Sequence, residues 1–324
     1  MDFILPFQLP PYPFKISYAD KILLVGSCFS EEIGNKMSEL KFNILQNPNG
    51  ILYDPISISE ALTSYIDNKP ITDNDLFELN GLWHSWKHHS AFSGVKKDEV
   101  LSKINQSQSS AHRFLANANL LIITLGTSYQ YQLKQNNQPV ANCHKAPSSI
   151  FRKKLLAIEE ITFSLLQVLH KLKIFNPHVK IIFTISPVKH VKDGIIENNR
   201  SKSRLIEAVH NHINEKNNCF YFPSYELVTD VLRDYRFYKS DLVHPNDIAI
   251  HFVFEKFCNS LLDEASKKAL EQIKNIMSAV NHRPFLKESD AHKKFIQAQL
   301  LSIQKMEKEY PFVDFSIEKK YFND

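Results

Sequence analysis

A serine and a cysteine near the N-terminus stand where a nucleophile could act. The segment Gly26-Ser27-Cys28-Phe29-Ser30 follows the apolar run 21–25 and precedes a stretch of helical period. At such a strand-to-helix turn a nucleophile is exposed at the sheet edge, and the N–H groups and dipole of the helix favour a thiolate and hold an oxyanion. The segment predicts Ser27 or Cys28 as the nucleophile. The structural alternative makes Cys28 a small buried hydrophobe and Ser27 or Ser30 a helix N-cap.

A second pattern of chemical residue types occurs late in the chain. In Ser240-Asp241-Leu242-Val243-His244-Pro245, an aspartate stands three residues before a histidine. On one turn the carboxylate can orient the imidazole through one ring nitrogen, while the other nitrogen serves as a general base. Alone, this spacing is typical of a surface turn. Together with the early nucleophile, it favours a catalytic site that contains Asp241 and His244.

Three histidines within residues 83–90 raise the possibility of a metal site. His84, His88 and His89 stand close together beside two tryptophans, and imidazole is a common zinc ligand. No carboxylate or thiolate follows at zinc spacing, and alternation along a strand would place the imidazoles on different faces. We therefore predict no metal and no cofactor. The segment instead indicates an aromatic wall facing substrate, with His89 and His144 as polar contacts in the cleft.

Glycines mark the ends of the strands that must position these residues. The chain has only 7 glycines in 324 residues, and Gly26, Gly50 and Gly126 each follow an apolar or strand-like run. Short apolar runs that end in glycine are typical of buried parallel strands, whose carboxyl ends carry the chemistry of open sheets. Further strands are predicted over 179–185 and 218–222. The alternation of strands with helical segments predicts an α/β fold.

Helices are predicted between these strands, over 30–40, 148–173 and 201–215. In the second of them, Leu155, Ile158, Phe163, Leu166 and Leu169 form the predicted buried stripe.

The chain is predicted to have two parts. Residues 1–262 form the α/β domain, with residues 70–95 as an inserted aromatic and His-rich segment, read as a hairpin. Residues 263–324 are rich in Lys, Glu, Ala and Gln and predict a helical extension. Packing of that extension on the sheet domain is favoured over a free partner-binding arm.

Composition excludes several classes of protein. Hydrophobic residues make up 43% and charged residues 23% of the chain, as in folded globular proteins. The net charge of +4 is too small and too dispersed to indicate nucleic acid. Four widely spaced cysteines favour a reducing compartment. The acidic, proline-broken N-terminus and the lack of a long apolar run predict a cytoplasmic protein without membrane contact.

The ordered motifs of the chain resemble those of the GSCFA family, within the SGNH/GDSL hydrolase superfamily. The resemblance covers residues 20–255 and starts at Gly26-Ser27-Cys28-Phe29-Ser30, where serine replaces the final alanine of the family motif. The further blocks are Asn47-Pro48-Asn49-Gly50-Ile51-Leu52-Tyr53-Asp54-Pro55, Leu125-Gly126-Thr127-Ser128, Asn142-Cys143-His144-Lys145, Ser186-Pro187-Val188-Lys189-His190, Tyr221-Phe222-Pro223-Ser224-Tyr225-Glu226 and Leu232-Arg233-Asp234-Tyr235-Arg236-Phe237-Tyr238, running into the Asp241/His244 block.

This resemblance implies a fold and a nucleophile. The implied fold is a flavodoxin-like three-layer α/β/α sandwich of the SGNH type, with a mostly parallel sheet and a C-terminal helical extension. In that superfamily the nucleophile is the third residue of a Gly-Asp-Ser motif, which is Cys28 here. Ser27 stands where the aspartate would be. A Cys28 nucleophile, a displaced Ser27 nucleophile and an inactive site all remain open.

The resemblance also implies an oxyanion hole. Gly50 matches the second-block glycine, whose backbone N–H points at the oxyanion. Gly126-Thr127-Ser128 matches a Gly-x-Asn block, so the Ser128 hydroxyl replaces an amide donor. Asp241 and His244 match the last block without change.

Three functions follow from this pattern. The first is hydrolysis of acyl esters, including carbohydrate O-acetyl groups, or acyl transfer, by Cys28 or Ser27 with His244 as base. The second is a catalytically degenerate module that binds a carbohydrate or peptide in the same cleft. The least favoured is a metal-dependent hydrolase built on His84, His88 or His89. The expected partner is a small-molecule or carbohydrate ester, with no nucleic acid or membrane, and a homo-oligomer is left open.

Overall fold

Five parallel strands form the central sheet of the computed structural model, which describes residues 5–280 and 289–323. Their order is β10-β9-β5-β1-β2, and every neighbouring pair is parallel. All five carboxyl ends therefore reach one edge, where open α/β sheets place their sites. The strands are β1 (Ile22–Gly26), β2 (Ile44–Gln46), β5 (Leu120–Leu125), β9 (Lys180–Ile185) and β10 (Cys219–Tyr221).

Alternate residues of each strand are buried on opposite faces of this sheet. Leu24 and Ile122 belong to one apolar core, whereas Leu23 and Ile123 belong to another on the opposite face. Because both faces are apolar, helices must cover both.

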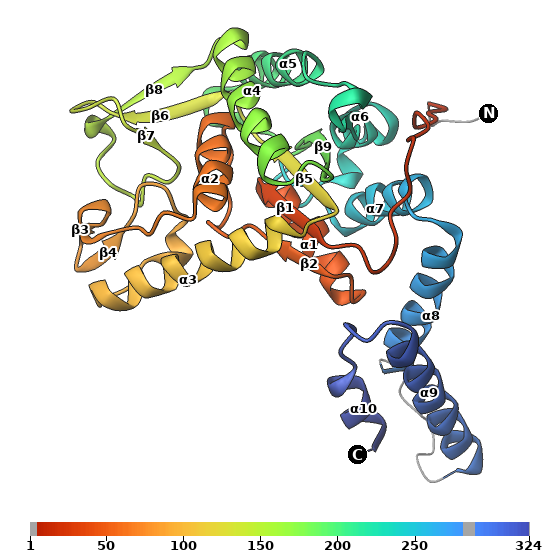
Figure 1. Ribbon diagram of the computed structural model, residues 1–324. Coiled ribbons are helices and arrows are strands. Elements are labelled where there is room, and N and C mark those ends of the chain that lie inside the picture. The colour runs from red at the N-terminus through yellow and green to blue at the C-terminus, as the bar shows by residue number, and fades with distance from the viewer. Residues whose placement is uncertain (1–4, 281–288, 324) are drawn as a thin grey trace.

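Helices cover the two faces unequally (Figure 1). One face carries α1 (Cys28–Glu39) and α7 (Asp247–Leu261). The other carries α2 (Pro55–Asp67), α3 (Lys97–Ala116), α4 (Ile158–Phe175) and α5 (Ile195–His210), and Tyr225 of the short α6 (Ser224–Glu226) packs against the same core. The predicted flavodoxin-like three-layer α/β/α sandwich is thereby confirmed.

Two small antiparallel sheets are added to this core. The first has the order β7-β6-β8 and begins four residues beyond the end of β5. The second is a hairpin inside the segment 70–95. The strands concerned are β3 (Phe77–Leu79), β4 (Leu82–His84), β6 (Tyr129–Leu133), β7 (Pro139–Val140) and β8 (Phe151–Leu155).

The predicted helix over 148–173 is wrong in its first part and in its buried face. Residues 151–155 form β8, which pairs antiparallel with β6, and the helix α4 starts at Ile158. Phe163 and Leu166 are 63% and 51% exposed. The side chains that face the sheet domain are Ile161, Leu165, Val168 and Leu172. The apolar residues on both sides of α4 made either stripe compatible with a helical period.

The C-terminal helices pack beside the amino ends of the sheet strands. They are α8 (Glu264–Val280), α9 (Asp290–Glu309) and α10 (Ser316–Asn323). Tyr18, which precedes β1, contacts the rings of Phe42 and Tyr310, and the Lys41 ammonium lies 2.9 Å from the Glu318 carboxylate. The three helices therefore lie away from the carboxyl edge.

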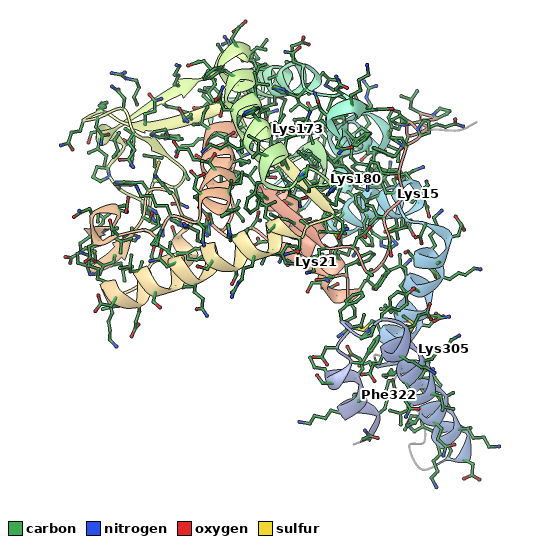
Figure 2. The ribbon with its side chains drawn as sticks, in the orientation of Figure 1. Lys15, Lys21, Lys173, Lys180, Lys305 and Phe322 are labelled. Carbon is green, nitrogen blue, oxygen red and sulfur yellow. The ribbon has the colours of Figure 1, made fainter. Side chains whose placement is uncertain are left out.

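Figures 1 and 2 show that the C-terminal helices are separate from the carboxyl edge of the sheet. Lys21, next to the start of β1, and Lys180, the first residue of β9, mark the amino side of the sheet, and Phe322 lies in the C-terminal helices below it (Figure 2). Within the described ranges, no helix is both long and apolar enough to cross a bilayer.

Candidate active site

The turn after β1 places Cys28 at the start of a helix. Gly26 has a φ of +140°, and a Cβ there would lie 2.1 Å from the carbonyl oxygen of Thr124, so the turn requires glycine. The Ser27 N–H donates to the same oxygen at 3.1 Å, and α1 begins with Cys28. The sharp turn thus brings Cys28 to the carboxyl edge of the sheet.

The structure presents one of the two candidate nucleophiles to the surface. Ser27 is fully buried, and no described residue forms a hydrogen bond with its hydroxyl oxygen. Cys28 is half-buried and lines a cleft of about 500 Å³ together with His244. A substrate in this cleft would meet the Cys28 sulfur and not the Ser27 hydroxyl.

Burial and the helix N-terminus act in opposite directions on the Cys28 thiol. Burial raises the pKa of Cys28, whereas the Lys202 ammonium and the N–H groups of Phe29 and Cys28 itself lower it. Backbone donors at a helix N-terminus stabilise negative charge on a sulfur or on an attached oxyanion. The site therefore holds a thiol that can be activated by a neighbouring base.

Asp241 and His244 form the predicted pair. The Asp241 carboxylate lies 2.7 Å from Nδ1 of His244 and also accepts the backbone N–H groups of Val243 and His244, each at 3.0 Å. These three hydrogen bonds lower the pKa of Asp241 to about 2, with the His244 N–H the largest cause. The fixed carboxylate leaves Nε2 of the imidazole as the nitrogen free to act as a base.

The walls of the cleft are aromatic and basic. The ammonium of Lys153 lies 4.4 Å from the ring centre of Tyr129 and 5.7 Å from that of Tyr131. Tyr53 lines the cleft near Cys28, and burial raises its pKa to about 12, so its hydroxyl stays protonated at neutral pH. Tyrosines of this kind offer an apolar face and a hydroxyl to a ligand.

The predicted oxyanion donors have other partners in the structure. The Gly50 N–H donates to the Asn47 carbonyl at 2.7 Å, and the Gly126 N–H donates to the Tyr53 carbonyl at 2.8 Å. The hydroxyl of Ser128 is buried and donates to Ser201. Because these groups are already bonded within the fold, the N–H groups at the start of α1 are better placed to hold an oxyanion.

His89 and His144 fix the hairpin and its neighbours instead of lining the cleft. His144 is buried, and its ring nitrogens lie 2.9 Å from the Ser85 carbonyl and 3.2 Å from the Ser90 hydroxyl. The His89 N–H donates to the Asn49 carbonyl, and its Nδ1 accepts the Ala91 N–H. Neither residue is among the described side chains around the cleft.

The remaining histidines of this segment also have structural partners. His84 Nδ1 lies 2.6 Å from the Ser93 hydroxyl, and His88 Nδ1 lies 2.9 Å from the Ser85 hydroxyl. Burial lowers the pKa of His88 to about 3, so it is neutral at physiological pH. Across residues 5–280 and 289–323, no group of three His, Cys, Asp or Glu side chains could hold a metal ion.

Lys202 is a site residue that the sequence analysis missed. It is 2% exposed, and its ammonium donates to the carbonyls of Gly126 and Ser186 at 2.6 and 2.7 Å, at the carboxyl ends of β5 and β9. Burial lowers the pKa of Lys202 to about 7, while the charge of Cys28 raises it. A signal was present, because Lys202 is three residues before Leu205 and seven before Val209 on the buried face of α5.

His190 is a second site residue that the sequence did not predict. It lines the cleft, its ring packs edge-on against Tyr53 at 5.5 Å, and its buried Nε2 has no hydrogen-bond partner among the described residues. Burial is the main cause that lowers its pKa to about 3, with the charges of Lys202 and His244 adding to the effect. A neutral imidazole therefore stands beside the Asp241–His244 pair.

A comparison with protein families matches the model of the GSCFA family to residues 21–257. The chain belongs to the GSCFA family. A second model, the GSCFA domain protein C-terminal domain, matches residues 273–324, a range that includes the end of α8 and all of α9 and α10. The family match spans the sheet and contains Cys28, Asp241 and His244 in this GSCFA protein.

Solved structures with a distant likeness include two esterases. One is described as an acetyl esterase mutant with acetate ion, at 10% identity and a TM-score of 0.36, covering 79% of this chain and 99% of that one. The other is a carbohydrate esterase family 3 protein from Talaromyces cellulolyticus, at 10% identity and a TM-score of 0.35, with the same coverage. None of the curated proteins compared with this GSCFA chain matches it.

Proposed function

We propose that this GSCFA protein hydrolyses small acyl esters, or transfers their acyl group, with Cys28 as the nucleophile. The observation that carries the proposal is that Cys28, at the N-terminus of α1, and His244, oriented by Asp241, line one cleft. A nucleophile, an oriented base and backbone donors are the parts that acyl transfer requires.

The proposed reaction has two steps. His244 takes the proton of the Cys28 thiol, and the sulfur attacks the ester carbonyl; the C–O bond then breaks, and His244 returns the proton to the leaving alkoxide. The acyl group is now a thioester on Cys28. In the second step His244 takes a proton from water, whose oxygen attacks the thioester; the acid leaves and the proton returns to the thiolate. An alcohol in place of water gives acyl transfer.

The cleft favours a small ester whose alcohol part can pack against rings. Tyr129 and Tyr131 line the cleft, and aromatic rings of this kind suit the apolar faces of a sugar. We therefore include carbohydrate O-acetyl esters in the proposed substrate class.

Hydrolysis of p-nitrophenyl acetate by the wild type and three variants tests the proposal. Cys28→Ala and His244→Ala should each lower kcat/KM by at least about 100-fold, because each removes a reacting group. Ser27→Ala is the matched control, because it removes a hydroxyl from the residue next to Cys28, and that hydroxyl is buried. This variant should retain activity within about threefold. Equal activity in folded Cys28→Ala and wild-type protein would refute the proposal.

Two observations favour a binding module as the second candidate. Burial raises the pKa of Cys28, and the predicted donors Gly50 and Ser128 are bonded elsewhere. A site of this kind could bind an ester without turning it over. Binding of an acetylated sugar that survives His244→Ala, with no ester cleaved by the wild type, would support the binding module.

A further inference from the structure

Lys202 is a buried cation whose electrostatic partner is the sulfur of the proposed nucleophile. The ammonium is held by two carbonyl oxygens, from Gly126 and Ser186, and neither of them carries a full charge. Among the described residues, Cys28 is the group that raises the pKa of Lys202, and it does so as a thiolate. Burying a lysine without a carboxylate partner is costly, so its presence needs a reason.

The backbone connects Lys202 to the Cys28 turn over a short path. The Ser27 N–H bonds the carbonyl of Thr124, and Gly126, whose carbonyl binds Lys202, is two residues further along. Both hydrogen bonds lie at the carboxyl edge of β5, beside the end of β1. The ammonium is thus fixed at the edge of the sheet that carries the Cys28 turn, and it is the largest of the influences that lower the pKa of the thiol.

We propose that Lys202 is a positioning residue that supplies the positive charge for the Cys28 thiolate and holds the ends of β5 and β9 around it. The inference rests on the proposed function, since it takes Cys28 as the nucleophile. Lys202 gives up no proton in the reaction: the thiol proton goes to His244, and the ammonium stabilises the charge left on the sulfur. The lysine is buried and is not among the residues that line the cleft, so its role needs no contact with substrate.

The experiment measures the pH dependence of Cys28 alkylation by iodoacetamide, read by mass spectrometry of the Cys28 peptide. The peptide readout separates Cys28 from Cys143, the other half-buried thiol. A nearby opposite charge changes a thiol pKa by about one to three. At pH 7 about half of the Lys202 side chains are protonated, because their pKa is about 7, so Lys202→Met should slow alkylation at pH 7 at least about fivefold and move the profile to higher pH.

Arg204 offers a matched control on the same helix. Its guanidinium also donates to two backbone carbonyls, those of Leu155 and Leu156, at 3.2 and 2.7 Å, and it is not among the described groups that shift the pKa of Cys28. Arg204→Met should therefore remove a similar anchor and leave the alkylation profile unchanged within about twofold. A merely structural role for Lys202 would give both variants the same profile, which would overturn the proposal.

A second pair of variants covers the case in which Lys202→Met does not fold. Lys202→Gln keeps a donor for a carbonyl without the charge and should slow alkylation as Lys202→Met does. Lys202→Arg keeps the charge and should stay within about threefold of wild type. Wild-type rates in folded Lys202→Gln would refute the proposal.

The alkylation experiment separates this inference from the proposed function. Iodoacetamide reports the thiolate whether or not an ester is cleaved. A profile that shifts in Lys202→Met while no variant hydrolyses any ester would support the charge pair and overturn the hydrolase. An unshifted profile with intact, Cys28-dependent hydrolysis would overturn the charge pair alone.

Discussion

The pH dependence of stability gives a quantitative test of where His144 lies. If His144 is a buried structural residue bonded to Ser85 and Ser90, the fold should hold it neutral down to acid pH. Burial is the main cause that lowers its pKa from 6.5 to about 4, and the Ser85 carbonyl opposes that change. Because the folded-state pKa is lower than the unfolded value, the unfolded chain binds more protons between these values, and stability falls as pH falls.

The size of the effect follows from the two pKa values. Between pH 8 and pH 5 the unfolded chain binds a proton at His144, whereas the folded chain binds it only below about pH 4. The free energy of unfolding therefore falls by about 2 kcal/mol over this interval. His88 and His190 have lowered pKa values as well and add to the total pH dependence. The comparison with a His144 variant isolates the share of this one residue.

Urea unfolding at pH 8 and pH 5 provides the assay. Wild-type protein should lose about 2 kcal/mol more than His144→Gln over this interval, because glutamine can bond to Ser85 or Ser90 but does not titrate. The slope of the free energy of unfolding with urea should be the same in both proteins, so that the midpoints compare directly. Equal losses in the two proteins would refute the structural role of His144 and reopen its role as an exposed contact residue.

Three further predictions follow from the geometry of the fold and site. Gly26→Ala should destabilise the protein by at least about 2 kcal/mol, seen as a lower midpoint in thermal unfolding, because the new methyl group overlaps the Thr124 carbonyl. Lys41→Met should lower the free energy of unfolding by about 2 kcal/mol, because it leaves the buried Glu318 carboxylate unpaired. Limited proteolysis should then cut α10 faster while esterase activity is unchanged, and protection equal to wild type would contradict this. Asp241→Asn should lower kcat at least about 100-fold with little change in KM, and by the same factor from pH 5 to pH 9, because the pKa of Asp241 is about 2; a defect confined to alkaline or acid pH would contradict this.

The sheet was predictable from the sequence because its signals are local. Apolar runs that end at Gly26 and Gly126 mark the ends of β1 and β5, and the side chains in them are buried on both faces. The alternation of such runs with helical segments then leaves few arrangements other than a doubly wound sheet. The boundary of α4 was not predictable in this way, because Phe163 and Leu166 are apolar but point to solvent.

The candidate site was predictable only where its residues sit on motifs. Cys28 follows a strand end, and Asp241 and His244 are three residues apart, so spacing alone relates them. The spacing of Lys202 from Leu205 and Val209 places it on the buried face of α5, but the two strand-end carbonyls that bind its ammonium converge only in the tertiary fold. The partners of Gly50 and Ser128 likewise depend on which backbone groups the tertiary fold brings within hydrogen-bond distance.

Trapping of an acyl group on Cys28 tests the central claim most directly. Wild-type protein is mixed with p-nitrophenyl acetate, quenched in acid within the first turnovers, and digested for peptide mass spectrometry. We predict one acetyl group on the Cys28 peptide, absent from Cys28→Ala and reduced in His244→Ala at matched times. Turnover of the ester with no acetyl group on Cys28, unchanged by Cys28→Ala, would contradict the account.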